Sequence, residues 1–512
     1  MNDWTSGYVA EIGYTFGYCA ELNPLRVQLI FLNAGIVAPE IGAACELGFG
    51  QGISTNFHAA ASVTQWHGTD FNPAHAGFAQ ELAGTSGSGA KLYDQAFAEF
   101  AGRADLPDFD YIGLHGVWSW ISDENRAVVV DFIRRKLKVG GVLFISYNTL
   151  PGWASLLPVR HLLKQFADTQ TAPGMGLVNR INSAIDFAEK LLDTNPLFAL
   201  SNPHLTERLK KLKTEDRHYL AHEYFNRDWQ PMHFATMGEW LAPAKLDYAC
   251  SAHYLDHIDA VNLSVPQQAF LHEIPDPLFR ETVRDVMVIQ RFRRDYWVKG
   301  KRQINLLEQT DALNSHKVLL VVPCADFVFK TTGSMGEANL VKAIYQPILD
   351  CLADHKPKTL AQISAAVKSA GIEFMQLRHA IMILLGKGDL VTVQDEKTIA
   401  KAKLSTGKIN LYLMNKSRCV NYINFLASPA SGGGIIVKRI HQLFLLAKLQ
   451  GGKTPEDWTA FTWKILKEQG QKLTHEGKIL DSDKENIAYL DTQSKQFLHK
   501  YLPIFQALGI AA

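Results

Sequence analysis

Short apolar runs alternate with longer segments of helical periodicity from residue 41 onward. Such alternation is the signature of a parallel sheet with crossover helices. It predicts strands at about 43–48, 65–69, 90–93, 110–114 and 142–147. Before the fifth strand, Ser122 is a suitable cap for a helix that runs to about Leu137, and Gly140-Gly141 is expected to end that helix.

The alternation stops at Pro151, and residues 155–230 have a mostly helical pattern. A helical insertion after the fifth strand is in the right place to cover the ends of the strands. Two strand-like stretches, 246–252 and 296–298, are expected to complete the sheet, together with a last helix at 234–242. The first domain would then be discontinuous and end near residue 303.

The character of the sequence changes again after a strand-like stretch at 318–322. Helical patterns at 341–353, 360–368 and 375–386, followed by a strand-like 389–393, resemble a winged-helix module. Arg378, His379 and Lys387 are few positive charges for a recognition helix, so binding of nucleic acid by this module is not favoured. The tail contains Ser428-Pro-Ala-Ser-Gly-Gly-Gly434, which its composition predicts to be flexible, and then amphipathic helical patterns.

These patterns divide the chain into six segments. They are an aromatic N-terminal flap at 1–40, a core at 41–154, the helical insertion at 155–230, a region completing the sheet at 231–303, a winged-helix-like domain at 304–404 and a helical region at 405–512. The first segment contains Tyr8, Tyr14, Phe16 and Tyr18, and either covers a pocket or only packs on the core.

Composition limits the functional classes. The 512 residues include 52 Lys and Arg against 51 Asp and Glu, so no overall field attracts nucleic acid or an anionic membrane. The six cysteines are scattered without metal spacing, which predicts no metal site. There is no signal-peptide pattern and no long uncharged apolar stretch, so no membrane span is expected. Together these features predict a cytoplasmic protein. The oligomeric state is left open, a homodimer included.

The stretch from Cys45 to Gly52 carries the clearest chemistry. Gly48, Gly50 and Gly52 follow an apolar run and lead into a helix start, which is typical of a nucleotide-type pocket. A dinucleotide site would favour a third glycine at position 53, which is isoleucine here. Glu46 would repel a pyrophosphate but suits a ligand that carries an amine.

Two acidic residues support this interpretation. Asp70 ends the next predicted strand, where a carboxylate can accept hydrogen bonds from ribose hydroxyls. Asp94 follows the third strand, near the expected place of an adenine. The pattern ExGxGxG with these two acids resembles class I S-adenosylmethionine-dependent methyltransferases, and the resemblance implies a Rossmann-like sheet and S-adenosylmethionine as cofactor.

Longer stretches make the resemblance closer. They are the sequence from Asp110 to Ser122, the sequence from Ser146 to Trp153, His222-Glu-Tyr-Phe-Asn226 and Phe292-Arg-Arg-Asp-Tyr-Trp-Val-Lys-Gly300. With these the chain resembles bacterial methyltransferases that carry a methyltransferase regulatory domain, a family that includes rickettsial protein lysine methyltransferases acting on outer-membrane proteins. The resemblance implies a protein lysine as acceptor, with an outer-membrane protein before export as one such partner.

The loops after the fourth and fifth strands supply the candidates for catalysis, because ligands of open α/β sheets lie outside the carboxyl ends of the strands. His115 is a candidate to deprotonate or orient the acceptor. Trp118, Tyr147 and Trp153 are candidates for an aromatic acceptor pocket, whereas Trp120 is expected to pack the loop onto a helix. Tyr18 and Glu21 are candidates to close over the amine and carboxylate of the cofactor.

Several alternatives remain at this stage. The acceptor could be RNA or a small metabolite, and the chain could also be a cofactor-binding scaffold without turnover. His222-Glu223 lacks the spacing of a metal pair and is interpreted as a helix start or a lid contact. The basic run from Arg291 to Arg302 is interpreted as a solvated helix face that leads into a strand.

Overall fold

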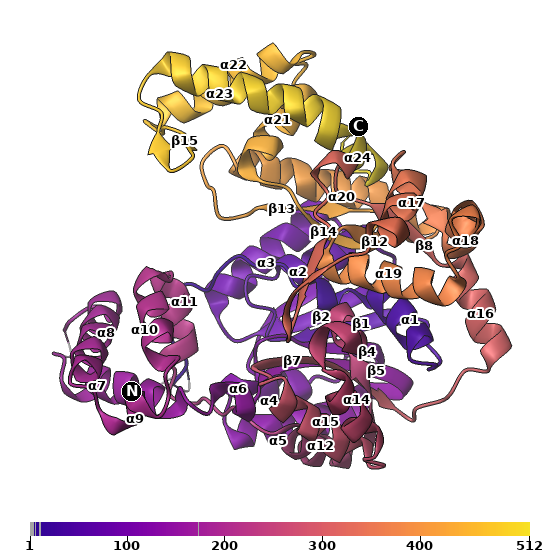
Figure 1. Cartoon of the computed structure of the whole chain (residues 1–512). Helices are drawn as coiled ribbons and strands as arrows, with labels where there is room; N and C mark the ends of the chain where they lie inside the picture. The colour runs from indigo at the N-terminus through magenta and orange to yellow at the C-terminus, as the bar shows by residue number, and fades with distance from the viewer. Residues whose placement is uncertain (1–4, 6, 10–11, 173, 512) are drawn as a thin grey trace.

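A seven-stranded sheet forms the centre of the computed structural model, which describes residues 5, 7–9, 12–172 and 174–511 (Figure 1). Its order is β3-β2-β1-β4-β5-β7-β6, with β7 antiparallel to both of its neighbours. The strands are β1 (Ala43–Leu47), β2 (Gln65–Asp70), β3 (Lys91–Asp94), β4 (Phe109–Leu114), β5 (Leu137–Asn148), β6 (Leu246–Ser251) and β7 (Phe292–Lys299). The predicted Rossmann-like α/β fold is confirmed, including completion of the sheet by late strands.

Helices cover both faces of this sheet. Helix α1 (Pro24–Asn33) packs against Tyr111, Phe144 and Tyr296 on one face. On the other face, α4 (Phe97–Ala101), α5 (Asp123–Lys136) and α12 (Phe234–Leu241) cover the opposite side chains of the same strands. Two further crossover helices, α2 (Ile53–Ala61) and α3 (Pro73–Ser86), follow β1 and β2.

The boundary between α5 and β5 differs from the prediction. Ser122 caps α5 as expected, since its hydroxyl accepts a hydrogen bond from the Asn125 N–H. The helix ends at Lys136, however, and Gly140 and Gly141 lie inside β5 rather than at the helix end. A Cβ on Gly141 would come within 2.9 Å of Leu137 Cδ1 and Lys138 O, so the glycine is required by a close approach at the irregular start of the strand.

The insertion is helical, as predicted, and forms a separate lobe (Figure 1). Leu163, Ile181, Leu209 and Leu220 contribute to a core of its own. Its helices are α6 (Leu150–Trp153), α7 (Leu157–Thr169), α8 (Leu177–Asp193), α9 (Leu197–Leu200), α10 (Leu205–Thr214) and α11 (Arg217–Tyr224). Three further helices, α13 (Asp259–Asn262), α14 (Val265–His272) and α15 (Pro277–Met287), lie between β6 and β7.

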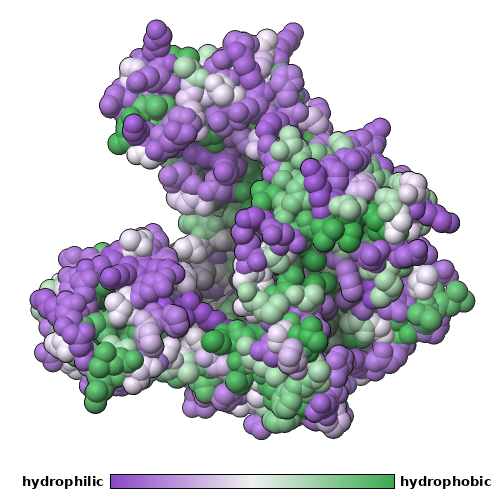
Figure 2. Space-filling view, viewed as in Figure 1, coloured by the Kyte–Doolittle hydropathy of each residue, from purple (hydrophilic) through white to green (hydrophobic). Residues whose placement is uncertain are grey.

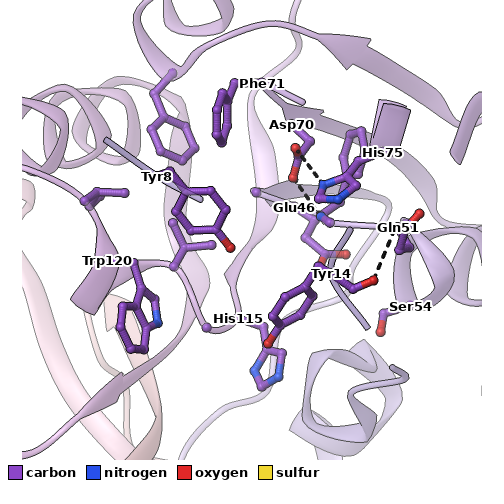
Figure 3. A pocket seen from close by; sticks show the side chains of 18 of the residues that line it. Tyr8, Tyr14, Glu46, Gln51, Ser54, Asp70, Phe71, His75, His115 and Trp120 are labelled. Carbon is purple, nitrogen blue, oxygen red and sulfur yellow. Dashed lines mark hydrogen bonds and ion pairs between the residues drawn. The ribbon is translucent and has the colours of Figure 1, made fainter. Parts of the chain in front are cut away.

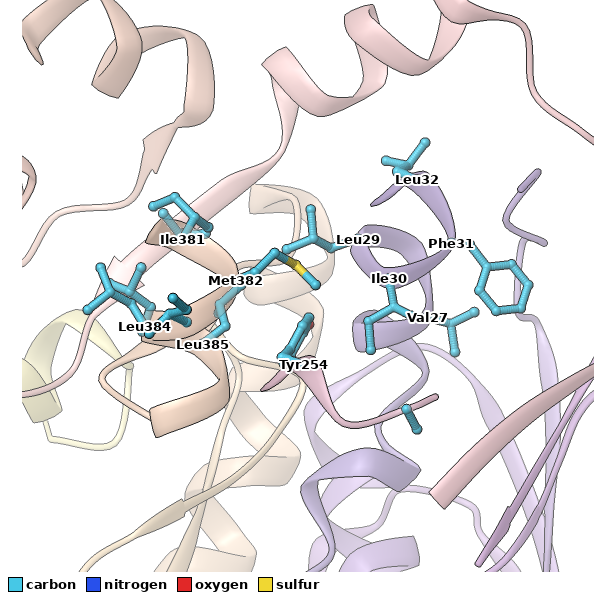
Figure 4. Packing of buried hydrophobic residues seen from close by; sticks show 14 of the residues in the cluster. Val27, Leu29, Ile30, Phe31, Leu32, Tyr254, Ile381, Met382, Leu384 and Leu385 are labelled. Atoms are coloured by element: carbon cyan, nitrogen blue, oxygen red, sulfur yellow. The ribbon is translucent and has the colours of Figure 1, made fainter. Parts of the chain in front are cut away.

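The region predicted to resemble a winged helix has a three-stranded sheet of order β11-β8-β12. Its helix α19 is packed among neighbours rather than presented to solvent, and Figure 4 shows Met382 of α19 facing Leu29 of α1. The elements are α16 (Leu306–Ser315), β8 (Lys317–Leu320), β9 (Lys330–Gly333), β10 (Gly336–Asn339), α17 (Lys342–Leu352), β11 (Lys358–Thr359), α18 (Leu360–Val367), α19 (Phe374–Lys387) and β12 (Leu390–Thr392). The helix that would correspond to a recognition helix is therefore mostly buried.

The Ser-Gly stretch at 428–434 was expected to be flexible, and this prediction is wrong. It is the buried turn of a hairpin between β13 (Phe425–Ser428) and β14 (Gly433–Ile436). A Cβ on Gly433 would lie 2.2 Å from the Tyr18 hydroxyl, and one on Gly434 would lie 2.7 Å from Phe57. The glycines are there because the hairpin packs directly against α2 and the N-terminal segment.

The remaining C-terminal elements are mainly helical, as expected. They are α20 (Glu396–Lys416), α21 (Arg439–Leu449), α22 (Pro455–Glu468), β15 (Thr474–His475), β16 (Lys478–Ile479), α23 (Asp483–Gln496) and α24 (Leu502–Ala507). Among the described residues, no helix is both long enough and apolar enough to cross a membrane.

Candidate functional site

A cavity of about 400 Å³ lies at the carboxyl ends of β1 to β4. One side of the cavity is formed by the segments at the ends of these four strands. They are Gly48–Gly52 after β1, Asp70 and Phe71 at the end of β2, Gln95–Phe97 after β3 and His115–Val117 after β4. Its roof comes from the N-terminal segment through Tyr8, Tyr14, Gly17 and Tyr18. Figure 2 shows a deep recess in the surface between the helical insertion and the C-terminal helices, on the face shown there.

The glycine loop approaches its neighbours too closely for side chains. Gly48 and Gly52 have φ values of +75° and +68°, in the left-handed region that favours glycine. A Cβ on Gly48 would lie 2.5 Å from Val117 Cγ2, and one on Gly52 would lie 2.5 Å from Ala79 Cβ. The loop therefore brings bare backbone to the floor of the cavity, at the N-terminus of α2.

Glu46 lies on β1 beneath this loop and is 3% exposed. Burial raises the pKa of its carboxyl to about 8, even though the hydrogen bond donated by the Thr55 hydroxyl favours the ionised form. A ligand that brings a positive charge to this carboxylate would favour its ionisation and relieve the cost of burying it.

Asp70 connects the loop to the end of β2. Its Oδ2 accepts a hydrogen bond from the Gly50 N–H at 2.8 Å, and its Oδ1 accepts one from the Asn72 N–H at 3.0 Å. His75 Nδ1 lies 3.3 Å from the same Oδ1. In Figure 3 the carboxylate lies beside His75, which also lines the cavity. Oδ2 has the one hydrogen bond from Gly50 and keeps capacity for a further hydrogen bond, which is what the predicted ribose contact requires.

Asp94 is placed differently from the prediction. It ends β3 but is exposed and does not line the cavity, whereas the next residue, Gln95, does. The polar side chain at this end of the cavity is therefore the amide of Gln95. Because successive residues of a strand point to opposite faces, an error of one position reverses the direction of the side chain.

His115 follows β4 and lines the cavity. Its Nδ1 lies 3.0 Å from Ser146 Oγ, which also accepts a hydrogen bond from the Gly116 N–H. Burial lowers the pKa of His115 to about 4, and the field of Glu21 opposes this only in part. The imidazole is therefore neutral at physiological pH.

Three of the predicted aromatic residues do not reach the cavity. Trp118 is fully buried, and its indole N–H donates to Met232 Sδ. Tyr147 is also buried, with its hydroxyl donating to Asp295 Oδ2 at 2.9 Å. Trp153 donates to the Arg291 carbonyl and packs on Trp229. These side chains stabilise the far side of the loops, away from the ligand.

Trp120, which was expected only to pack, lines the cavity instead, together with Tyr8 and Tyr14 (Figure 3). The WSW turn from Trp118 to Trp120 is a 3-10 turn that directs Trp118 toward Trp240 and leaves Trp120 beside the cavity. The aromatic residues at positions 8 and 14 were visible in the sequence, but only the folded chain brings them to the glycine loop.

Tyr18 and Glu21 have separate roles. Tyr18 lines the cavity, and its hydroxyl lies 3.1 Å from His58 Nε2. Glu21 does not line the cavity and pairs with Arg294 at 2.8 Å. Burial alone would raise the pKa of Glu21, but the hydrogen bond with His253 and the charges of Arg26 and Arg294 outweigh it and hold the pKa well below its usual range. Glu21 is thus committed to an internal ion pair.

The basic run near residue 293 is not a solvated helix face. Arg293 lies in β7, is buried, and forms ion pairs with Glu281, Asp285 and Asp295. The described residues contain no cluster of three or more His, Cys, Asp or Glu able to hold a metal ion, around His222 or elsewhere. His222 lies in the last turn of α11 and not at a helix start, and its Nε2–H donates to the Ile12 carbonyl in the N-terminal segment, a contact of the kind expected for a lid.

Comparison with known proteins gives consistent matches. A family model described as a predicted methyltransferase regulatory domain matches residues 216–299, from α11 to β7. The uncharacterized protein sll1526 of Synechocystis sp. is 39% identical over 513 residues, which cover 99% of this chain and 100% of that protein. The uncharacterized protein RP789 of Rickettsia prowazekii is 26% identical over 234 residues, 42% of this chain and 41% of that protein.

Solved structures match over the same length. The structure of PKMT2 from Rickettsia typhi in complex with AdoHcy has a TM-score of 0.69 at 18% sequence identity, covering 97% of this chain and 99% of that chain. The similarity therefore extends through the insertion and the C-terminal regions, not only through the sheet.

Proposed function

The chain belongs to the family of S-adenosylmethionine-dependent methyltransferases with a methyltransferase regulatory domain, and we propose that it methylates lysine side chains of a protein. One observation carries the proposal: Glu46, the glycine loop and Asp70 line one cavity, at the sheet edge where ligands of open α/β folds bind. The similarity to a rickettsial enzyme over nearly the whole chain supports a protein as the acceptor.

The residues present fit the cofactor. There is no space for a Cβ at Gly48 or Gly52, so the loop presents bare backbone to the cavity, and Asp70 Oδ2 has free capacity for a ribose hydroxyl. Glu46 supplies a negative charge for an amine, and Gln95, Ala96 and Phe97 form the wall where an adenine would lie. The cavity of about 400 Å³ lies within the range of sites for molecules of this size.

When bound, S-adenosylmethionine supplies an activated methyl group, and the protein has to align the acceptor and exclude water. A lysine amine has a reference pKa of about 10.4, and an aromatic, poorly solvated pocket disfavours its charged form. Tyr8, Tyr14 and Trp120 form such a wall. His115, with a pKa near 4, is too weak a base to take a proton from an ammonium, so its proposed role is to orient the neutral amine through a hydrogen bond.

Labelled S-adenosylmethionine tests the acceptor. We expect transfer of label to the protein fraction of a host lysate, with methyl-lysine recovered after acid hydrolysis and strongly reduced transfer by the Asp70→Ala variant at low cofactor concentration. An outer-membrane protein, before its export from the cytoplasm, is the acceptor we would test as a purified protein. Label confined to RNA or to small metabolites would refute the lysine proposal, and binding of cofactor without any transfer would indicate a scaffold.

The pKa of Glu46 gives a prediction for cofactor affinity against pH. The positively charged amine of the cofactor favours the ionised carboxylate, but Glu46 is mostly protonated below pH 8. Binding then releases a proton, so affinity should rise between pH 6 and 7.5, with a slope that approaches tenfold per pH unit. Isothermal titration in buffers of different ionisation enthalpy measures both affinity and proton release. Glu46→Gln should flatten the slope, and a variant with an unchanged slope would show that another group titrates.

A further inference from the structure

The roof of the cavity is a strap, defined here as the described residues of 5–23. Tyr8 and Tyr14 of the strap line the cavity, and Figure 3 shows both rings between Trp120 on one side and Gln51 on the other. Gln51 of that loop donates to the Tyr14 carbonyl at 3.3 Å. A ligand that rests on the loop is therefore covered by strap residues, and it has to pass them to enter or leave.

The first half of the strap is attached to the helical insertion. The Val9 N–H donates to Asn226 Oδ1 at 2.8 Å, and the Arg227 N–H donates to the Gly7 carbonyl at 3.0 Å. Val9 and Ile12 also pack against the apolar core of the insertion. This half of the strap would move with the insertion if the insertion moved.

Helix α11 provides two further bonds through histidine rings. His218 Nδ1–H donates to the Gly13 carbonyl at 3.1 Å, and His222 Nε2–H donates to the Ile12 carbonyl at 2.9 Å. The His222 ring also packs against both roof residues, with centroid distances of 5.4 Å to Tyr8 and 5.1 Å to Tyr14. Its Nδ1 is buried and has no hydrogen-bond partner among the described residues. The bond to Ile12 is thus the polar contact that sets the position of this ring.

The second half of the strap is attached to the C-terminal region instead. Phe16 stacks on Tyr422 at a centroid distance of 4.4 Å, and Asn23 Nδ2 donates to the Ser431 carbonyl at 2.9 Å. Tyr18 contacts Gly433 and Gly434 so closely that no side chain would fit at either position. Here a ring packs directly on glycine backbone, whereas α11 holds the first half through the two histidine hydrogen bonds and the ring contacts of His222.

Two glycines of the strap have open space around them: Gly13, whose carbonyl is bonded to α11, and Gly17, which lies between Phe16 and Tyr18. A Cβ on Gly13 or Gly17 would meet nothing within 4 Å, so packing does not hold the chain at these positions. Glycine has the widest choice of backbone angles, which suits a hinge. The geometry therefore divides the strap into a half that can be released at α11 and a half that stays on the C-terminal region.

We propose that His222 is a positioning residue that holds Tyr8 and Tyr14 over the cavity through Ile12, and that cofactor and its product enter and leave when this half of the strap detaches from α11. This inference rests on the proposed cofactor site, but it concerns the rate of exchange and not the identity of the acceptor. Tyr8 and Tyr14 of the strap line the cavity, so weakening the attachment of the strap should accelerate both entry and exit.

The variant that tests this is His222→Phe, which keeps a ring between Tyr8 and Tyr14 and removes the bond to Ile12. We expect association and dissociation rates of S-adenosylhomocysteine to rise together by about fivefold, the effect of one net hydrogen bond, with the equilibrium affinity changed less than about twofold. Stopped-flow fluorescence of Trp120 and its neighbours gives both rates. His218→Ala, an exposed position, should shift both rates in the same direction by about twofold.

His161→Phe is the matched control, because His161 is an exposed residue of the same insertion on α7. Its rates should equal those of the wild type. Unchanged rates in His222→Phe would overturn the proposal. Faster dissociation with an equal loss of affinity would also overturn it, because His222 would then be part of the binding surface itself.

Hydrogen exchange of the ligand-free protein tests the strap independently of the cofactor. In His222→Phe, peptides covering residues 7–17 should exchange faster, whereas the hairpin at 425–436 should not change. Equal exchange of residues 7–17 in variant and wild type would refute the release of the strap, whatever ligand the cavity binds. A failure of the wild type to bind S-adenosylhomocysteine would instead refute the proposed cofactor.

Discussion

Replacing Asp70 with alanine should weaken binding of S-adenosylmethionine on the order of 100-fold, about 3 kcal/mol. The side chain supplies the charged acceptor for ribose hydroxyls, and hydrogen bonds to charged groups are each worth about 1.5–3 kcal/mol. It also accepts the Gly50 N–H at 2.8 Å, so its loss frees the glycine loop on which the ligand rests. Isothermal titration calorimetry with cofactor and with S-adenosylhomocysteine measures the change.

Asp94→Ala is the matched control for this prediction. Asp94 is a carboxylate at the end of the neighbouring strand, but it is exposed and does not line the cavity. Its variant should bind within about twofold of the wild type. If Asp70→Ala kept full affinity, or if Asp94→Ala lost as much, the ribose contact would have to be reassigned.

Replacing Arg293 with leucine should destabilise the protein by about 3–5 kcal/mol, because it leaves buried carboxylates without their cation. Arg293 pairs with Asp285 at 2.6 Å, Asp295 at 2.8 Å and Glu281 at 2.9 Å. Asp295 in turn accepts the hydroxyl of Tyr147, so the damage extends from β7 to β5. Urea unfolding followed by circular dichroism gives the loss of stability.

The pH dependence of the stability of Arg293→Leu shows whether the loss comes from unpaired buried charges or from poorer packing. Burial already raises the pKa of Asp285 to about 7 with Arg293 present, and removing the cation raises it further above its unfolded value. The folded variant then binds more protons than the unfolded chain, so its stability falls as pH rises. The deficit should be larger at pH 8 than at pH 5. Arg294→Leu, in the same strand but partly exposed, should cost less than half as much, and equal losses in both variants would contradict the network.

The sheet was predictable because its strands are buried on both faces. Such strands appear as apolar runs without reference to distant residues, and the order of elements fixes the parallel connections. Glu46, the three glycines and Asp70 were predictable for a related reason, since one strand, one turn and the next strand bring them together within about 25 residues.

The acceptor side of the cavity was harder to predict. Ser146 bonds to His115, whereas its neighbour Tyr147 points to Asp295, and only the pairing of β5 with β7 decides which of the two faces the ligand. Tyr8 and Tyr14 reach the cavity because α11, more than 200 residues later, holds the strap. Contacts at such separation leave no local pattern in the sequence.

The hairpin that contains Gly433 and Gly434 is a second case in which the sequence alone did not predict the contacts. Composition suggested a flexible linker, because serine and glycine are common in linkers. The same small residues also allow the closest packing of backbone against a ring, and here that use prevails, with Tyr18 and Phe57 as partners. Only the contacts across the fold distinguish the two uses.

That hairpin also constrains how the C-terminal region can be exchanged between relatives. Exchanging the C-terminal region for that of a relative with another substrate would replace the surface on which Tyr18, a wall of the cofactor cavity, is seated. A chimera that joins two parents near residue 404 would therefore need Tyr18, Phe57 and the two glycines from the same parent. The C-terminal hairpin and this wall of the cavity are therefore structurally coupled, and an exchange of the C-terminal region has to carry both sides of the contact.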